Sequence, residues 1–434
     1  MLSLFQTHNN LNTSANDFAD NQRTASNHAC SSFAISPNDN PLNAENCKAN
    51  CKANCKIDSR GKFAVIDMGS NSFRLCIFDD AKSGDESKIK FVETCRLGEG
   101  FHETLTIQPV PMARGVETCE KFVEICKENG VVRIFCFATA VVREAKNRDE
   151  FIGKIEKLRL LVHILSGNQE ALCGFLGASV GVLGSGNCDC DDNDSSVKPT
   201  GEVDISEQTD ILGQDDISEQ TDILGQDDIS EQIAIFDIGG ASFEIAIGSL
   251  GDFVGLFAGA TNFPTHDEII EKSKGTYCGL STFPLEFSHS FKMGAVRMTD
   301  MFLEDFDKLN DYILSVFTEF EKSSGKKLRL DKMKCVGIGG TITSLCGLVC
   351  GCENFKPQLH GFVCDSETIY SLAKHIQQMT PIQRLSLPFL KDKRKEIIAS
   401  GSEILALGMK FFGAEQITAS LTDNLEGYRL YLGI

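Results

Sequence analysis

The sequence predicts an α/β protein in which two related domains face each other across a cleft. The main observation is an internal duplication, because FAVIDMGSNSFRLCIF (Phe63–Phe78) returns as IAIFDIGGASFEIAIG (Ile233–Gly248). Both copies have the pattern strand, Asp-x-Gly turn, strand, and turns of this kind are common singly. Two copies in register indicate duplication. The second observation is that the remaining segments alternate between strand and helix patterns.

The first domain is expected to begin with three strands, the first two of which are joined by a tight glycine turn. A helical stripe of Met112, Val116, Cys119, Val123 and Cys126 follows and ends at Gly130. A helix from Gly167 to Leu176 closes the domain. The expected strands are Phe63–Asp67, Phe73–Asp79, Ile89–Arg96, Val132–Ala138 and Leu161–Ser166.

The second domain is expected to start with the repeated hairpin at Ile233–Gly248. Further along, Lys334–Val336 has a strand pattern, Gly337–Thr341 is a glycine-rich turn and Thr343–Leu348 continues as a helix. The chain therefore divides into residues 1–56, 57–183, 184–232 and 233–434, with a C-terminal helix that could return to the first domain. The first of these ranges is expected to be a disordered tail, because it has almost no apolar periodicity.

Residues 184–232 are expected to form an acidic loop without chemistry of its own. The 12-residue segment DISEQTDILGQD at Asp204–Asp215 is repeated directly afterwards, and Asp189–Glu231 carries 15 acidic residues and one basic residue. Of the net charge of −19, this tract supplies −14, so the rest of the chain carries −5. Duplex nucleic acid, which needs a broad basic face, is an unfavourable partner, and a phosphate chain would have to be held by local cations and backbone amides.

The 18 cysteines do not predict a disulfide framework. Apolar, periodic segments contain six of them, at Cys76, Cys95, Cys126, Cys136, Cys173 and Cys346, where a free thiol packs as a small hydrophobe. A reducing cytoplasm is the simpler interpretation, since the chain has neither a signal pattern nor an apolar run long enough to span a membrane. Cys47, Cys51 and Cys55 lie in a CKAN repeat, which is either a zinc site or a repeat expansion.

The first glycine turn has the composition of an anion site. Gly69, Ser70, Asn71 and Ser72 can direct backbone amides and short polar side chains at one oxyanion, and Arg74 offers a forked donor suited to phosphate. The alternative is an ordinary type I′ hairpin with Arg74 on the surface.

The second hairpin has Glu244 at the position that Arg74 occupies in the first. Asp237 and Glu244 could supply the carboxylates that Mg²⁺ prefers, beside phosphate oxygens held at Gly239 and Gly240. Asp67, the matching aspartate of the first hairpin, is a further candidate metal ligand. The alternative is that Glu244 pairs with a nearby arginine.

Three more positions are candidates for chemistry. Gly339, Gly340 and Thr341 lie between a strand and a helix, where they form either a phosphate cradle or a close-packed turn without ligand. Arg143 follows a strand end, where open α/β sheets bind ligands. Glu170 lies in the first turn of a helix, which acidic residues favour for electrostatic reasons alone.

Together these motifs resemble the exopolyphosphatase and guanosine pentaphosphate phosphohydrolase family (Ppx/GppA), a member of the actin-like ATPase superfamily. The resemblance extends from Lys62 to Gly433 apart from the acidic loop, and it implies two actin-like (ribonuclease H-like) domains. Seven segments carry it in order: DMGSNSFR, RLGEGF, ATAVVREAKN, SGNQEA, DIGGASFE, GIGGT and TASLTDNLEGYRL.

The resemblance implies a role for each matched residue. Glu170 takes the position of the general base that activates water, and Asp237 and Glu244 take those of the magnesium-associated carboxylates. The phosphate-contacting positions are Asn71, Ser72, Arg74, Arg143, Gly239 and Gly240. The chain departs from the family pattern at Ala241, Phe243 and Gln169, and Asn424–Gly427 reads Asn-Leu-Glu-Gly where Gly-Leu-Arg-Glu-Gly is usual. The departures imply an altered rate or chain-length preference.

The predicted function is Mg²⁺-dependent release of terminal phosphate from inorganic polyphosphate, pppGpp or both, in the cytoplasm and without a membrane partner. Two other classes stay open at this point: a non-catalytic regulator that binds polyphosphate or an alarmone, and an actin-like small-molecule kinase. A homodimer is compatible with the sequence.

Overall fold

The computed structural model describes residues 61–79, 81–82, 87–184, 232–255, 281–352, 357–390 and 392–434, which belong to one compact unit, Ser59–Ile434. The expected tail at 1–56 with its CKAN cysteines, and the acidic repeats between Asp189 and Glu231, lie outside these residues. Among the described helices, none is both long and apolar enough to cross a membrane.

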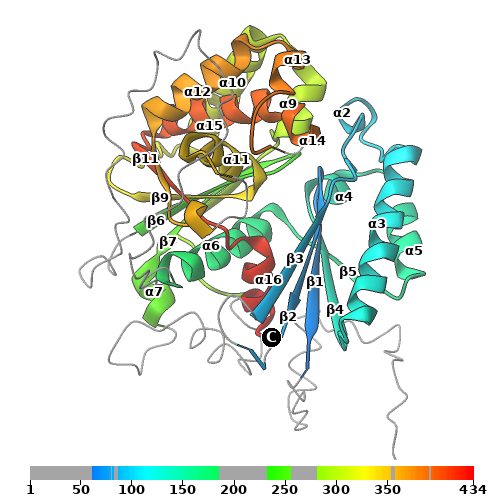
Figure 1. Cartoon of the computed structure of the whole chain (residues 1–434). Coiled ribbons are helices and arrows are strands. Elements are labelled where there is room, and N and C mark those ends of the chain that lie inside the picture. Colours follow the sequence, from blue (N-terminus) through cyan, green and yellow to red (C-terminus); the bar gives the residue numbers. More distant parts are fainter. Residues whose placement is uncertain are drawn as a thin grey trace, which may run out of the picture. The chain divides into compact units, whose positions relative to one another are not determined.

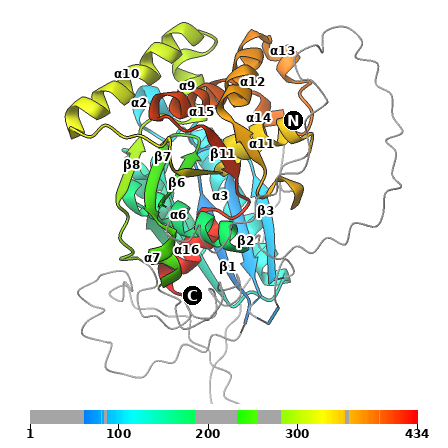
Figure 2. The same ribbon diagram turned by 90° about the vertical axis from the view of Figure 1, so that its left-hand side faces the viewer.

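Two sheets form the framework, and they share one topology (Figures 1 and 2). In each sheet, three consecutive antiparallel strands are followed by two parallel strands on the far side of the first, and the second sheet has one further, antiparallel strand at that edge. The first sheet has the order β3 (Lys88–Glu93), β2 (Phe73–Phe78), β1 (Phe63–Met68), β4 (Arg133–Ala138) and β5 (Val162–Ile164). The second has the order β10 (Val363–Asp365), β11 (Gln416–Ala419), β9 (Lys334–Ile338), β6 (Gln232–Ile238), β7 (Phe243–Ser249) and β8 (Phe287–Phe291).

This shared topology confirms the predicted α/β fold with an internal duplication. The registers agree as well, because Asp67 lies opposite Arg74 in the first hairpin and Asp237 lies opposite Glu244 in the second. The connection between β1 and β2 is not a type I′ turn, since that type needs positive φ at its two central residues and neither Ser70 nor Asn71 has it.

Helices α6 (Gly167–Gly184) and α16 (Asn424–Leu432) lie between the two sheets. Most of the other helices cover the outer faces, whereas Leu250 and Phe253 of a short helix pack into the core between the sheets. On the first sheet the covering helices are α2 (Phe101–Thr104), α3 (Pro109–Glu128), α4 (Ala140–Glu144) and α5 (Arg148–Glu156). We call the part of the chain around the first sheet the first-sheet half and the part around the second sheet the second-sheet half. The second-sheet half contains α7 (Leu250–Gly255), α9 (Ala295–Phe302), α10 (Phe306–Ser324), α11 (Gly339–Cys350), a 3₁₀ helix (Pro357–Leu359), α12 (Ser366–Gln378), α13 (Pro381–Arg384), α14 (Asp392–Lys395) and α15 (Ile398–Phe412).

The central strands are apolar on both faces because helices cover both. In β1, Phe63 and Val65 pack into the core between the sheets, whereas Ala64 and Ile66 pack into the outer core of the first sheet. Side chains alternate along a strand, so Asp67 points the same way as Val65, toward α6 and α16. Side chains alternate in the same way along β6, so Asp237 points toward this middle layer from the second sheet.

Several helices and strands begin or end at other residues than the sequence predicts. The helix expected at 112–126 begins at Pro109, where proline suits the first turn, and β3 ends at Glu93 rather than Arg96. Gly339, Gly340 and Thr341 form the first turn of α11 and not a separate loop, because β9 continues to Ile338 and the helix begins at the next residue.

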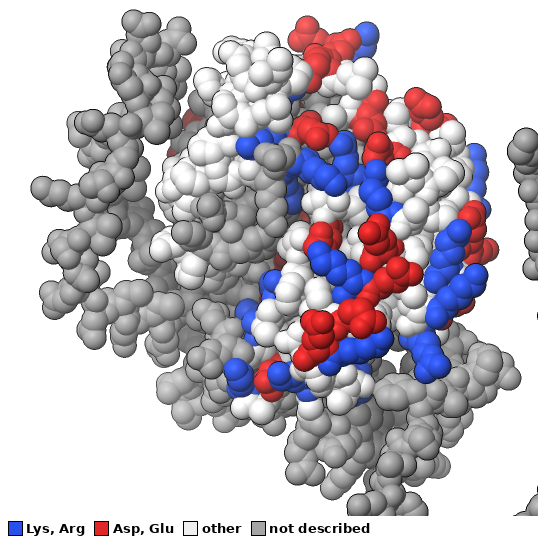
Figure 3. Space-filling view, turned by 45° about the vertical axis from the view of Figure 1, so that its right-hand side comes forward, with Lys and Arg blue, Asp and Glu red and all other residues white. Residues whose placement is uncertain are grey.

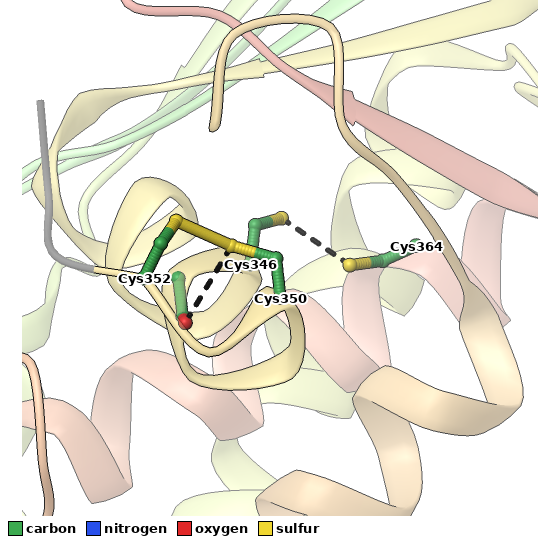
Figure 4. Close-up of a disulfide and its surroundings, with 5 residues drawn as sticks. Cys346, Cys350, Cys352 and Cys364 are labelled. Atoms are coloured by element: carbon green, nitrogen blue, oxygen red, sulfur yellow. Dashed lines mark hydrogen bonds between the residues drawn. A yellow bond between two sulfur atoms is a disulfide. The ribbon is translucent and has the colours of Figure 1, made fainter. Parts of the chain in front are cut away.

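The six cysteines expected to be buried, reduced core residues are all buried free thiols. The described residues contain one disulfide, Cys350–Cys352, with its Cα atoms 5.6 Å apart (Figure 4). A bridge between residues so close in sequence closes too small a loop to stabilise the fold as a framework would. Nearby, the Sγ atoms of Cys346 and Cys364 lie 3.5 Å apart in the core.

Helices α6 and α16 cross at glycines, which allows their backbones to touch. A Cβ atom on Gly177 would lie 2.0 Å from the carbonyl oxygen of Asp423, and one on Gly427 would lie 1.7 Å from the carbonyl oxygen of Cys173. No side chain fits at either position, so the crossing is fixed by steric exclusion.

We expect Gly177→Ala to lower the free energy of unfolding by about 3 kcal/mol, at the upper end of the overpacking range, because the added methyl group meets backbone. Denaturant unfolding measures this. Gly153→Ala in α5 is the matched control, since a Cβ there meets nothing within 4 Å. Equal stability of the two variants would contradict the crossing described above.

Candidate active site

A cavity of about 100 Å³ lies at the carboxyl ends of β1, β6 and β9, where the N-termini of three helices meet. Glu170 comes from the first turn of α6, Gly339–Thr341 from that of α11, and Asp423 and Asn424 from the start of α16. Helix N-termini favour anions, so the cavity wall is suited to a negatively charged ligand. The predicted site residues on the wall are Asp67, Gly69, Ser70, Asn71, Ser72, Arg74, Glu170, Asp237, Gly239, Gly240, Gly339, Gly340 and Thr341.

The two glycine turns contact each other at the bottom of the cavity. A Cβ on Gly240 would lie 2.9 Å from the amide nitrogen of Asn71, so only glycine allows this approach. The carbonyl groups of the turns are already occupied, because Ser70 O accepts from Gly98 N at 2.9 Å and Gly240 O accepts from Val296 N at 2.8 Å. These two carbonyl oxygens are therefore directed at amide donors of the protein.

Arg74 is held by two carboxylates. Its Nε donates to Asp67 Oδ2 at 2.8 Å within the first hairpin, and its Nη1 donates to Asp423 Oδ2 at 2.5 Å across the cavity. Asp423 and Asp67 together raise the pKa of Arg74 against the opposing effect of its burial. The alternative of a surface arginine is therefore wrong.

Glu170 is buried, and Arg143 is its partner. Arg143 Nη1 donates to Glu170 Oε2 and to the carbonyl oxygen of Leu165, both at 2.8 Å. Burial raises the pKa of Glu170 to about 7, although Arg143 opposes this. Arg143 does not line the cavity, so in this structure it contacts the acid and not the space that a phosphate would occupy.

The carboxylates of the second hairpin differ in position. Asp237 lies on the wall, where its Oδ2 accepts from Asn424 Nδ2 at 2.6 Å, and burial raises its pKa to about 6. Glu244 lies behind the wall and accepts from Ser290 Oγ at 2.6 Å. Burial, reinforced by Glu170, raises the pKa of Glu244 well above its usual value. Its partner is a hydroxyl group and not an arginine.

Several buried oxygen atoms around the cavity have no hydrogen-bond donor. They are Asp67 Oδ1, Asn71 Oδ1, Glu244 Oε2 and Asn424 Oδ1. Unpaired buried acceptors are costly unless a cation or water satisfies them, and hard cations take oxygen ligands of this kind. The described residues contain no cluster of three or more metal-binding side chains. Mg²⁺ needs no such cage, because it takes one or two carboxylates with waters and phosphate oxygens. The residues present therefore fit Mg²⁺.

Arg394 is a cavity residue that the sequence patterns did not single out. Its guanidinium lies against the first turn of α11, so that a Cβ on Gly340 would come within 2.0 Å of Nη1. Burial, together with the charge of Arg74, lowers its pKa to about 10. Within the residues that the structure describes, no carboxylate pairs with it. It is a half-buried cation that faces the cavity beside a helix N-terminus suited to anions.

The family departure at Ala241 does not narrow the cavity. Ala241 is buried in the outer core of the first-sheet half and lies outside the cavity lining. Gln169, another departure, donates from Nε2 to the hydroxyl group of Tyr431 at 2.8 Å and so links α6 to α16. Neither residue contacts the space for a ligand.

Polar contacts outside the cavity join the part of the chain that contains the first sheet to the part that contains the second. Lys393 Nζ donates to Thr94 O at 3.0 Å, Arg297 Nη2 donates to Glu144 Oε2 at 2.9 Å, and Arg96 pairs with Glu396. On the face in Figure 3, basic and acidic side chains are interspersed and neither sign forms a continuous surface. Inside the cavity, Arg74 and Arg394 supply positive charge for an anionic ligand.

The model of the Ppx/GppA phosphatase family matches residues 88–188 and 228–431. Among curated proteins, the chain is 30% identical over 126 residues to guanosine-5'-triphosphate,3'-diphosphate pyrophosphatase of Aeromonas hydrophila. It is 29% identical over 138 residues to a bifunctional 3-dehydroquinate synthase/phosphatase of Fusobacterium nucleatum. These matches cover 29% and 30% of this chain, and only 25% and 20% of those proteins.

Solved structures resemble the chain over more of its length. An exopolyphosphatase from Cytophaga hutchinsonii superimposes with a TM-score of 0.60 at 19% identity, covering 86% of this chain and 98% of that one. The Aquifex aeolicus member of the Ppx/GppA family gives a TM-score of 0.53 at 20% identity, covering 85% and 96%. The likeness confirms the two-domain, actin-like fold that the sequence predicts.

The raised pKa values predict how stability depends on pH. Between about pH 4.5 and about pH 7, the folded protein keeps protons on Glu170 and Asp237 that the unfolded chain releases. In EDTA the free energy of unfolding should therefore fall by roughly a few kcal/mol as the pH rises through this window, because one unit of pKa shift corresponds to about 1.4 kcal/mol. Glu170→Gln should flatten the slope. Denaturant unfolding with an unchanged slope in this variant would contradict the assignment.

Proposed function

The chain belongs to the Ppx/GppA phosphatase family, and we propose that it hydrolyses the terminal phosphoanhydride of inorganic polyphosphate or pppGpp in the presence of Mg²⁺. The observation that carries the proposal is the position of Glu170. It lies on the wall of a cavity that is also lined by two glycine turns and by the N-termini of α11 and α16. A buried acid and anion-binding groups thus share one small space, as hydrolysis of a phosphate ester or anhydride requires.

Glu170 acts as the general base. Its pKa of about 7 suits proton transfer near neutral pH, because a base is most effective when its pKa is close to the working pH. The water oxygen attacks the terminal phosphorus, Glu170 takes the water proton, and the bond from phosphorus to the bridging oxygen breaks. The products are orthophosphate and a chain one phosphate shorter. Arg143 orients the carboxylate through its bonds to Glu170 and to the Leu165 carbonyl.

The phosphate groups are held mainly by fixed donors. Gly69–Ser72, Gly240 and the first turn of α11 offer backbone amides, and Thr341 adds a hydroxyl group. Gly239 lines the cavity, but its amide donates to Ser242 O at 3.0 Å within the turn. Arg394 supplies a guanidinium that has no carboxylate partner among the described residues, and Arg74 shares its own between two acids and the ligand. Positioning and charge stabilisation supply most of the rate in phosphoryl transfer, so this arrangement is adequate.

Mg²⁺ would be held by Asp67 and Asp237 on the cavity wall, with Glu244 behind them. When bound, it would neutralise phosphoryl oxygens and the surplus negative charge of the site. The unpaired oxygen atoms of Asp67 and Glu244 support this assignment.

The first test is incubation of the purified chain with polyphosphate, pppGpp and ATP separately, with and without Mg²⁺. We expect Mg²⁺-dependent release of orthophosphate from polyphosphate or pppGpp and none without the cation. Binding without release would favour a regulator of the same ligands. Consumption of ATP that depends on an added acceptor would indicate a kinase.

Glu170→Gln should reduce kcat by roughly 100-fold or more and leave KM nearly unchanged, because it removes the base but keeps the size of the side chain. The matched control is Asp149→Asn, which changes a carboxylate in the first turn of α5 whose side chain is 97% exposed. Steady-state phosphate release decides the matter, and a fully active Glu170→Gln variant would exclude Glu170 as the base.

A further inference from the structure

Asp423 places a fixed negative charge in the cavity, directly beside the arginine that is expected to bind phosphate. Its Oδ2 accepts from Arg74 Nη1 at 2.5 Å, and both residues lie on the wall. We propose that Asp423 is a specificity-determining anion: it makes the site accept phosphate chains that bring a divalent cation and reject bare anions. The inference rests on the proposed function, which it deepens by naming the form of the substrate.

The Asp423 carboxylate cannot readily turn away to admit a phosphate. It caps α16, where Oδ1 accepts from Leu425 N at 3.0 Å, and its own amide donates to Glu426 Oε2 at 3.1 Å. Glu426 is buried and bonded to Lys90 Nζ at 2.7 Å. The backbone of Asp423 also lies against Gly177 of α6. An anchored carboxylate of this kind keeps its place when a ligand enters.

Arg74 must therefore be shared. Two of its nitrogen atoms donate to Asp67 and a third donates to Asp423, so the two acids already compensate its charge. A phosphate oxygen that approaches Arg74 also approaches the Asp423 carboxylate, and like charges in a buried site repel strongly. The attraction that one arginine would normally offer to a phosphate is largely cancelled here.

The charge balance of the whole site has the same consequence. If all groups are ionised, five carboxylates face three guanidinium groups, which leaves two negative charges, the amount that one divalent cation neutralises. These groups are Asp67, Glu170, Asp237, Glu244 and Asp423 on one side and Arg74, Arg143 and Arg394 on the other. When a phosphate chain brings a divalent cation, the cation cancels the net negative charge of the protein groups. A bare chain or orthophosphate instead adds negative charge to a site that is already negative. Rejection of free orthophosphate would also assist product release.

Asp423→Asn tests the proposal because it removes one charge and keeps the cap, since asparagine caps helices as well as aspartate. Calorimetric titration with sodium tripolyphosphate in EDTA should show binding about tenfold tighter or more than for the natural chain. Titration with Mg²⁺ alone should show weaker binding by about threefold or more. The affinities for the two ligands should thus change in opposite directions. A local loss of structure would weaken both.

Asp423→Ser, which also caps helices but is shorter, should behave like Asp423→Asn. Glu304→Gln is the control, because Glu304 is the partner of the buried Arg384 in the second-sheet half and does not line the cavity. It should change neither titration. Equal or weaker tripolyphosphate binding by both Asp423 variants, or a shift of both ligands in the same direction, would overturn the proposal. If the natural chain releases no phosphate with Mg²⁺, the proposed function fails, while the titrations still decide the role of Asp423.

Discussion

The site depends on a surplus of buried carboxyl groups over arginines, which the protein alone accommodates only by keeping some of the acids protonated. Carboxylates from both hairpins and from two helix N-termini meet in one small cavity, and burial raises the pKa values of Asp67, Glu170, Asp237 and Glu244. These acids can all be ionised together only when a cation compensates their charge, and otherwise protons do so. The fold therefore keeps a polar space ready for a cation and a phosphate chain together, and this requirement links the metal, the base and the choice of substrate.

The architecture explains why this surplus forms at all. Strand periodicity turns Asp67 and Asp237 toward the layer that α6 and α16 occupy, and the glycine crossing of these helices brings Asp423 and Glu170 to the same place. Helix N-termini then offset part of the repulsion between the acids. Packing and charge are thus coupled, because the small residues that fix the helices also fix the spacing of the carboxylates.

Part of the fold and of the candidate site could be predicted from the sequence, because the duplication determines which residues occupy equivalent places in the two hairpins. The two related hairpins and the part of the cavity wall that their glycine turns form followed from that pattern. Arg394 did not, since it lies in a polar segment without a glycine or strand-end signal, and the basic run Lys393–Lys395 before a long apolar helix was the one available sign. The pair of Arg74 and Asp423 joins residues 349 positions apart, and the partner of Glu170 depends on how α4 and α6 pack. Local patterns carry no record of such contacts.

Calorimetric titration of Mg²⁺ into the metal-free chain, in buffers of different ionisation enthalpy near pH 6.5, tests the central claim most directly. Because Asp237 and Glu170 have pKa values of about 6 and about 7, a cation that binds beside them must displace protons. The account predicts saturable binding to one site per chain with release of protons to the buffer. Absence of saturable binding, or binding without proton release, would contradict it.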